Sequence, residues 1–213
     1  MKKILASWMF LAMTIPLFAA DEFKPKFNPV QEKRYRDFSN IILIMLKIKN
    51  ASLRSSDDDV GKSVGEYLYE IYPSVFADLQ EFIKNNPDSH FLPEVKILFA
   101  ELYIRRVMFY TEDSAISSKM SQEIKNFYMA CKAEMLIYLL SVIDGDYQNI
   151  YFSIPEGISS GEPAVAIALC QLAILTGDDK YFDKVKNDYP DSLSIKEATE
   201  ISERIKKRRS NDK

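Results

Sequence analysis

Apolar residues recur in this chain at fixed offsets from three prolines, Pro87, Pro155 and Pro190. They lie eight and five residues before each proline, and eleven and fifteen residues after it. The twelve positions are Leu79, Phe82, Leu98, Leu102, Tyr147, Ile150, Ala166, Cys170, Phe182, Val185, Ile201 and Ile205. Spacings of three and four residues share one face of an α-helix, so each block predicts one helix before its proline and another after it.

The prolines also define a period. Pro155 follows Pro87 by 68 residues, or two periods of 34, and Pro190 follows Pro155 by 35. A glutamate stands seven residues after each proline, at Glu94, Glu162 and Glu197. Such self-similarity is typical of stacked helical hairpins, because one hairpin cannot bury its apolar face alone. The unit expected around Ser121 departs from the pattern, since Asp113 and Lys132 would occupy apolar positions.

The same periodicity predicts helices over 30–49, 64–71, 73–85, 91–111, 115–143, 146–153, 162–175, 178–188 and 193–208. We expect the helix over 115–143 to be broken near Ser121. No long segment alternates with period two, so the predicted fold class is all-α, built from antiparallel helix hairpins. Residues 91–111 and 127–143 are apolar on nearly every side, and we expect both segments to be buried all round.

Two proline turns carry a shared motif that leads into the next helix. They are Asn86-Pro87-Asp88-Ser89 before Glu94-Val95, and Tyr189-Pro190-Asp191-Ser192 before Glu197-Ala198; Gly145-Asp146 and Gly177-Asp178 stand between helices. These motifs resemble the tetratricopeptide repeat family in its bacterial envelope form. The resemblance covers about residues 76–206 and implies an α-solenoid that acts as an interaction scaffold rather than an enzyme. The 13 residues from Gly177 to Pro190 are about one helical turn shorter than in the family, and bulky Phe182 replaces a small residue.

The N-terminus predicts export. Lys2 and Lys3 precede the uncharged run Ile4 to Phe18, and Ala19 and Ala20 precede the first acid, which is the order of a cleaved secretory signal peptide. The run of 15 residues is shorter than the roughly 20 needed to span a bilayer. No cysteine near the cleavage site offers an acyl anchor, so we expect a soluble periplasmic or secreted protein. A buried N-terminal helix is the alternative.

This organisation gives a signal peptide at 1–20, an extended tether at 21–29, N-terminal helices at 30–75, tetratricopeptide-like repeats at 76–208 and a basic polar tail at 209–213. Without residues 1–20 the chain carries 26 basic and 31 acidic side chains, which argues against nucleic acid as a partner. Arg204 to Arg209 form a cationic cluster. The macrodipole of the last helix explains it better than a contact with anionic lipid or cell wall.

Catalytic and metal-binding patterns are weak. His90 is the only histidine, so we expect no metal, no cofactor and no enzymatic activity. Gly61-Lys62-Ser63 resembles the end of a phosphate-binding loop, but Ser56 occupies the position where that loop needs glycine. Asp57 to Asp59 lack the glycine of a calcium loop, because Lys62 stands there. Both segments are better interpreted as solvated loops.

Cys131 and Cys170 are the two cysteines, and an even number in an exported chain is compatible with a disulfide. Both lie at apolar helical positions of different repeats. This placement favours two buried thiols over a bridge.

Lys96, Tyr103 and Tyr110 recur every seven residues and share a helix face distinct from that of Leu98 and Leu102. Tyrosine is enriched at binding hot spots, so these three are the candidate partner-binding residues. The alternative is that the rings are structural and only their hydroxyls reach solvent. The expected function is an exported scaffold or adaptor that binds another envelope protein. A helical ligand-binding or inhibitory module of the periplasm is the second interpretation.

Overall fold

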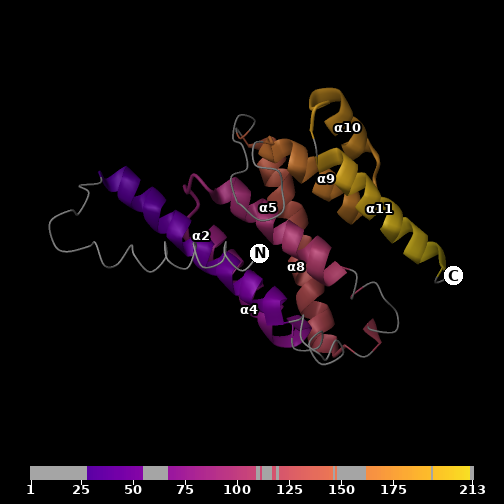
Figure 1. The fold of residues 1–213 in the computed structure, drawn as a ribbon, viewed down its shortest axis with the longest axis horizontal. Coiled ribbons are helices and arrows are strands. Elements are labelled where there is room, and N and C mark those ends of the chain that lie inside the picture. Colours follow the sequence, from indigo (N-terminus) through magenta and orange to yellow (C-terminus); the bar gives the residue numbers. More distant parts are fainter. Residues whose placement is uncertain are drawn as a thin grey trace, which may run out of the picture. The chain divides into compact units, whose positions relative to one another are not determined.

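The computed structural model describes residues 28–54, 67–108, 111, 117–118, 120–145, 147, 162–192 and 194–211. The chain divides into two units, Met1–Arg36 and Asp37–Lys213. Helix α2 (Pro29–Arg54) crosses this boundary (Figure 1). At its start, the Asn28 side chain accepts a hydrogen bond from the Gln31 amide at 2.9 Å, and the Gln31 side chain accepts one from the Asn28 amide at 3.0 Å. This reciprocal pair is a capping box, which explains why the helix begins here.

The second unit is built from helices, whose order Figure 1 shows. They are the π-helical turn η1 (Tyr67–Ile71), α4 (Tyr72–Asn85), α5 (Leu92–Leu102), the π-helical turn η2 (Tyr103–Val107), α8 (Gln122–Asp144), α9 (Ala164–Thr176), α10 (Lys180–Asp188) and α11 (Ser194–Asn211). The described residues contain no strand, which confirms the all-α prediction. Ser121 caps α8, since its Oγ accepts a hydrogen bond from the Ile124 amide at 3.3 Å. The predicted break near Ser121 is thus the start of a helix.

Several predictions fall outside the described residues. They concern the signal peptide at 1–20, most of the tether at 21–29, the acidic run Asp57–Asp59, the Gly61-Lys62-Ser63 segment and the helix over 146–153. Helix α11 continues to Asn211, so the predicted basic polar tail at 209–213 is helical over 209–211.

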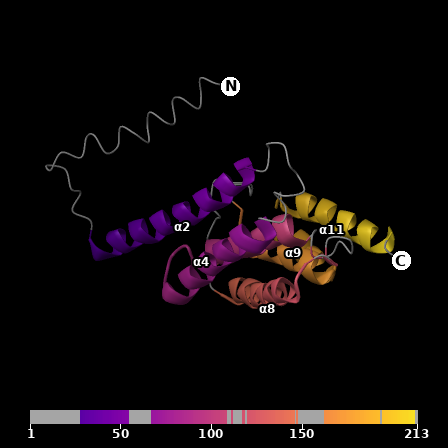
Figure 2. The same ribbon diagram turned by 90° about the horizontal axis from the view of Figure 1, so that it is seen from below.

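Helix α9 forms the centre of the second unit. Every residue from Ala164 to Leu175 is buried, and α9 packs against α5, α8, α10 and α11 (Figures 1 and 2). Helix α5 is buried in the same way apart from the half-buried Lys96. A helix that is apolar on every side is stable only when neighbouring helices cover every side. The prediction that residues 91–111 are buried all round is therefore confirmed for α5.

Helix α8 differs from the prediction made for residues 127–143. Its buried residues share one face, which packs on α5 and α9: Tyr128, Cys131, Met135, Leu139 and Val142. Met129, Ile137 and Leu140 are 60%, 64% and 43% exposed. The prediction that 127–143 is buried all round is wrong, because the neighbouring helices cover one side of α8 and leave its apolar opposite side in solvent (Figure 2).

The proline-anchored positions form much of the core. Nine of the twelve are buried: Leu79, Phe82, Leu98, Leu102, Ala166, Cys170, Phe182, Val185 and Ile205. Tyr147 and Ile201 are half-buried, and Ile150 lies outside the described residues.

The two described proline turns have the same backbone geometry. Asn86 adopts φ −130° and ψ 57°, and Tyr189 adopts φ −137° and ψ 59°. The amide of Asn86 donates to Phe82 O at 3.0 Å, as that of Tyr189 donates to Val185 O at 2.8 Å. The shared motif therefore specifies one local conformation at two places in the chain.

Gly177 ends α9 in the left-handed conformation, with φ 70°. Its amide donates to Ala173 O at 2.9 Å, which closes the last turn of the helix. Only glycine adopts this conformation without steric cost, so the Gly177-Asp178 turn separates α9 from α10 as the sequence predicts.

Both cysteines are free and buried, which confirms the preferred interpretation. Burial raises the pKa of each thiol to about 12. The protonated thiols act as small apolar side chains in the core.

Candidate functional site

Of the predicted partner-binding residues, Tyr103 is buried and Lys96 is half-buried. Tyr103 is 4% exposed, and its ring meets that of Phe76 edge-on, with centroids 6.5 Å apart. The half-buried Lys96 ammonium donates a 2.7 Å hydrogen bond to Ser141 Oγ on α8, and burial lowers its pKa. Tyr110 lies outside the described residues. Lys96 and Tyr103 thus contact neighbouring helices. These contacts agree with the alternative interpretation, in which this helix face is structural.

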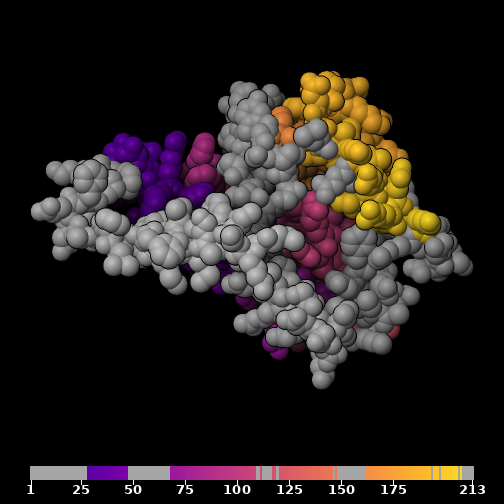
Figure 3. Space-filling model, viewed as in Figure 1, coloured from indigo at the N-terminus to yellow at the C-terminus, as the bar shows by residue number. Residues whose placement is uncertain are grey.

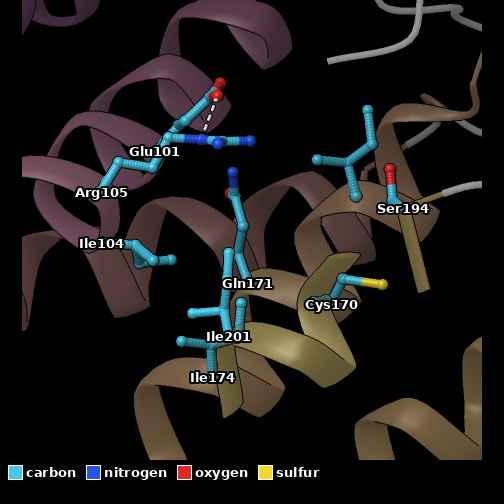
Figure 4. A pocket seen from close by; sticks show the side chains of 10 residues that line it. Glu101, Ile104, Arg105, Cys170, Gln171, Ile174, Ser194 and Ile201 are labelled. Carbon is cyan, nitrogen blue, oxygen red and sulfur yellow. Dashed lines mark ion pairs between the residues drawn. The ribbon is translucent and has the colours of Figure 1, made fainter. Parts of the chain in front are cut away.

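A different set of residues lines a pocket between three helical segments (Figure 4). These segments are α5 together with η2, then α9, and then α11. Its cavity is about 40 Å³ in volume. In the space-filling view the magenta surface of α5 and η2 borders the yellow surface of α11 (Figure 3). The lining is apolar apart from four residues: Glu101, Arg105, Gln171 and Ser194. We call this site the three-helix pocket.

An ion pair forms one wall of the three-helix pocket. Arg105 Nε lies 2.7 Å from Glu101 Oε1, one helical turn away. The Glu101 side chain is 10% exposed, whereas that of Arg105 is 35% exposed. Since a partly buried ion pair is screened less than a surface pair, this wall presents a fixed polar group to anything that enters.

Gln171 extends from α9 toward that ion pair (Figure 4). Its Nε2 donates to the Ile97 carbonyl oxygen at 3.3 Å, and its Oε1 is buried with no hydrogen-bond partner among the described residues. A buried acceptor without a donor costs about 1–3 kcal/mol. Gln171 Oε1 therefore has an unmet hydrogen-bonding capacity beside the pocket.

The π-helical turn η2 contributes two of the residues that line the pocket. It follows α5 directly, and Ile104 and Arg105 belong to it. A π-helical turn widens the helix by one residue and is frequent at functional sites, because it redirects the side chains that follow.

The three-helix pocket contains one of the two thiols, that of Cys170. Burial raises the pKa of the Cys170 thiol to about 12, so this thiol is protonated at neutral pH and is a poor nucleophile. The described residues contain no cluster of three or more His, Cys, Asp or Glu that could hold a metal ion. A cavity of about 40 Å³ accommodates about one small side-chain group, whereas small-molecule sites measure roughly 300–1,000 Å³.

A second, wider hollow lies between α2 and α4 in the second unit, with a volume of about 340 Å³. Lys47 and Asp78 form an ion pair at its edge. The other lining residues are Asn40, Leu43, Ile44, Glu81, Phe82, Asn85 and Asn86. Its size is compatible with a small molecule, and six of its nine lining residues are polar.

Two glutamates at the same distance from their prolines have different surroundings. Glu162 accepts hydrogen bonds from Ser192 Oγ at 2.7 Å and from the Ser194 amide at 2.9 Å. Glu94 is 1% exposed, and its Oε2 has no partner among the described residues. Desolvation raises the pKa of Glu94 to about 7, although a hydrogen bond with its own backbone opposes the rise. Of Glu197 the structure describes only the backbone.

The chain matches no protein-family model, no curated protein and no solved structure. The tetratricopeptide-like resemblance therefore remains a prediction. Within the described part of the chain, α8 alone is long and apolar enough to cross a membrane by length and composition.

Sequence reasoning missed the residues of the three-helix pocket. One signal was present, because Gln171 is the single polar side chain between Ala164 and Leu175. A polar residue in a helix that is buried all round needs a local reason. Glu101 and Arg105 carried no comparable signal, since pairs spaced by four residues are common on helix surfaces.

Proposed function

We propose that this protein is an exported scaffold or adaptor of the cell envelope, with tetratricopeptide-like helical hairpins that bind another protein. The three-helix pocket is the observation that carries this proposal. Its apolar lining and its ion-paired wall suit one protruding side chain of a partner, and its volume suits nothing much larger. The leader pattern at the N-terminus of the sequence supports a location in the periplasm or outside the cell.

The identical turns at Pro87 and Pro190 and the buried proline-anchored positions support the hairpin repeat in this proposal. Repeat arrays of this kind present surfaces built from several helices, and the three-helix pocket draws its residues from α5, α9 and α11.

A photo-crosslinking amino acid at Arg105, in the native cell, tests the proposal. The matched control position is Lys184, which is exposed on α10 and does not line the pocket. We expect a discrete adduct with an envelope protein at position 105 and none at 184. Equal labelling at both positions, or no protein adduct at either, would contradict the proposal.

The wider hollow between α2 and α4 supports a second candidate function, a helical ligand-binding module, because about 340 Å³ lies within the range of small-molecule sites. Native mass spectrometry of the purified protein separates the two candidates. A bound small molecule that is lost in Asn85→Leu, together with no adduct at position 105, would favour the ligand-binding module.

A further inference from the structure

The outward face of α8 carries an uncharged apolar strip that consists of Met129, Ala133, Ile137 and Leu140. All four are exposed, and Met129 and Ile137 retain 60% and 64% of their accessible surface. With 100° per residue, their spacing of four, four and three keeps them within about 80° of one another on the helix. The buried residues of α8 lie on the opposite side. The strip is thus a continuous face that the described residues leave uncovered.

The size of the strip indicates a specific contact. Its large side chains expose roughly 300 Å² of apolar surface, which is the size of the largest patch on many monomers and is often functional. The exposed charges at its two ends are Glu123 and Asp144. Because anionic membranes attract cations, acidic groups at both ends disfavour a lipid surface as the occupant.

We propose that this strip binds a second copy of the same chain, with the two α8 helices antiparallel across a two-fold axis. A register centred between Glu134 and Met135 places Met129 directly opposite the partner subunit's Leu140. It brings Ala133 within one residue of the position opposite the partner subunit's Ile137. The small Ala133 then leaves room for the large Ile137 of the partner subunit near the centre of the contact, which lets the two helices approach closely. The two-fold axis makes each contact occur twice.

Charge complementarity favours the antiparallel direction. In the antiparallel register the half-buried Lys125 lies opposite Asp144 of the partner subunit, and the pair occurs twice. A parallel arrangement would instead bring Glu123 against Glu123 of the partner subunit and Asp144 against Asp144 of the partner subunit. Opposite charges across an interface favour the first arrangement and like charges oppose the second.

The expected affinity follows from the area. Two strips with their flanking residues would bury on the order of 1,000 Å², at the lower end of specific interfaces. A Kd in the micromolar range is therefore expected.

Sedimentation equilibrium of the mature chain between about 1 and about 100 μM tests the dimer across this range of Kd. We expect reversible dimerisation that Ile137→Asp weakens at least tenfold. Asn187→Asp, an exposed position on α10, is the matched control and should leave the Kd unchanged. Lys125→Glu should weaken the dimer, and addition of Asp144→Lys should restore it. A chain that is monomeric at the highest concentration, or a dimer that Ile137→Asp does not affect, would overturn the proposal.

Cysteine pairing tests the register. Met129→Cys protein mixed with Leu140→Cys protein should form a disulfide-linked dimer under mild oxidation. Either variant alone should not, because eleven residues of helix separate like positions by about 16 Å. The parental chain is the control for its own buried thiols. A disulfide formed by Met129→Cys alone would indicate parallel helices and overturn the proposal, as would vesicle binding by a monomer. These outcomes are independent of the three-helix pocket.

Discussion

The Glu162 carboxylate accepts a 2.7 Å hydrogen bond from the hydroxyl of Ser192, thirty residues further along the chain. The Ser194 amide donates to the same carboxylate at 2.9 Å. Glu162 precedes α9, while Ser192 lies in the Pro190 turn and Ser194 begins α11. One buried acid therefore ties the start of the central helix to the turn that sets the direction of the last one.

Ser192→Ala should destabilise the domain by about 1–3 kcal/mol, because it removes a donor from a buried carboxylate. Urea denaturation followed by circular dichroism measures the free energy of unfolding. Ser74→Ala, at an exposed position of α4, is the control and should change it by less than about 0.5 kcal/mol. Equal midpoints for the two variants would show that the Glu162–Ser192 contact contributes little.

Glu94 predicts a pH-dependent stability. Its pKa is about 7 in the folded chain against 4.5 for an ordinary glutamate, so folding favours the protonated form. The contribution to stability is complete below pH 4.5 and is lost as the pH rises through 7.

Glu94→Gln, which is neutral at all pH values, should remove this dependence. The native chain should therefore gain about 2–3 kcal/mol relative to the variant when the pH falls from 8 to 5. Urea denaturation of both proteins at the two pH values provides the measurement. Parallel changes in both proteins would place the pH dependence on other groups.

Gly177→Ala should cost about 1 kcal/mol or more, since alanine is strained at φ 70°. A Cβ at this position would meet no atom within 4 Å, so the cost comes from the backbone alone. Gly177→Asn should cost less, because asparagine tolerates the left-handed conformation better. Thermal unfolding of the two variants compares their stabilities. A less stable Gly177→Asn protein would show that side-chain contacts, and not backbone strain, determine the cost of substitution.

Neither thiol should react with a disulfide reagent in the folded protein. Burial raises the pKa of Cys131 and Cys170 to about 12, and the thiolate is the reactive form. Spectroscopic thiol titration at pH 8 should find both groups only after denaturant is added. Rapid modification of one thiol under native conditions would show that its helix opens locally.

The features that the sequence predicted well are determined locally. The proline turns after Asn86 and Tyr189, the helix boundary near Ser121 and the turn at Gly177 each depend on a few adjacent residues. Helix periodicity also located the buried face around Leu98. The orientation of Tyr103 and the exposure of Ile137 depend on which helices pack against them. Periodicity shows that a face is apolar, but only tertiary packing decides whether another helix covers it.

Helix α9 has a consequence for the unfolded chain. From Ala164 to Leu175 its one polar side chain is that of Gln171, and four other helices bury it. Before those helices close, twelve successive residues expose an apolar segment of the kind that aggregates or binds chaperones. A chain that crosses a membrane unfolded would carry this segment uncovered on both sides. Its biogenesis would then depend on a carrier that holds α9 until the surrounding helices have formed.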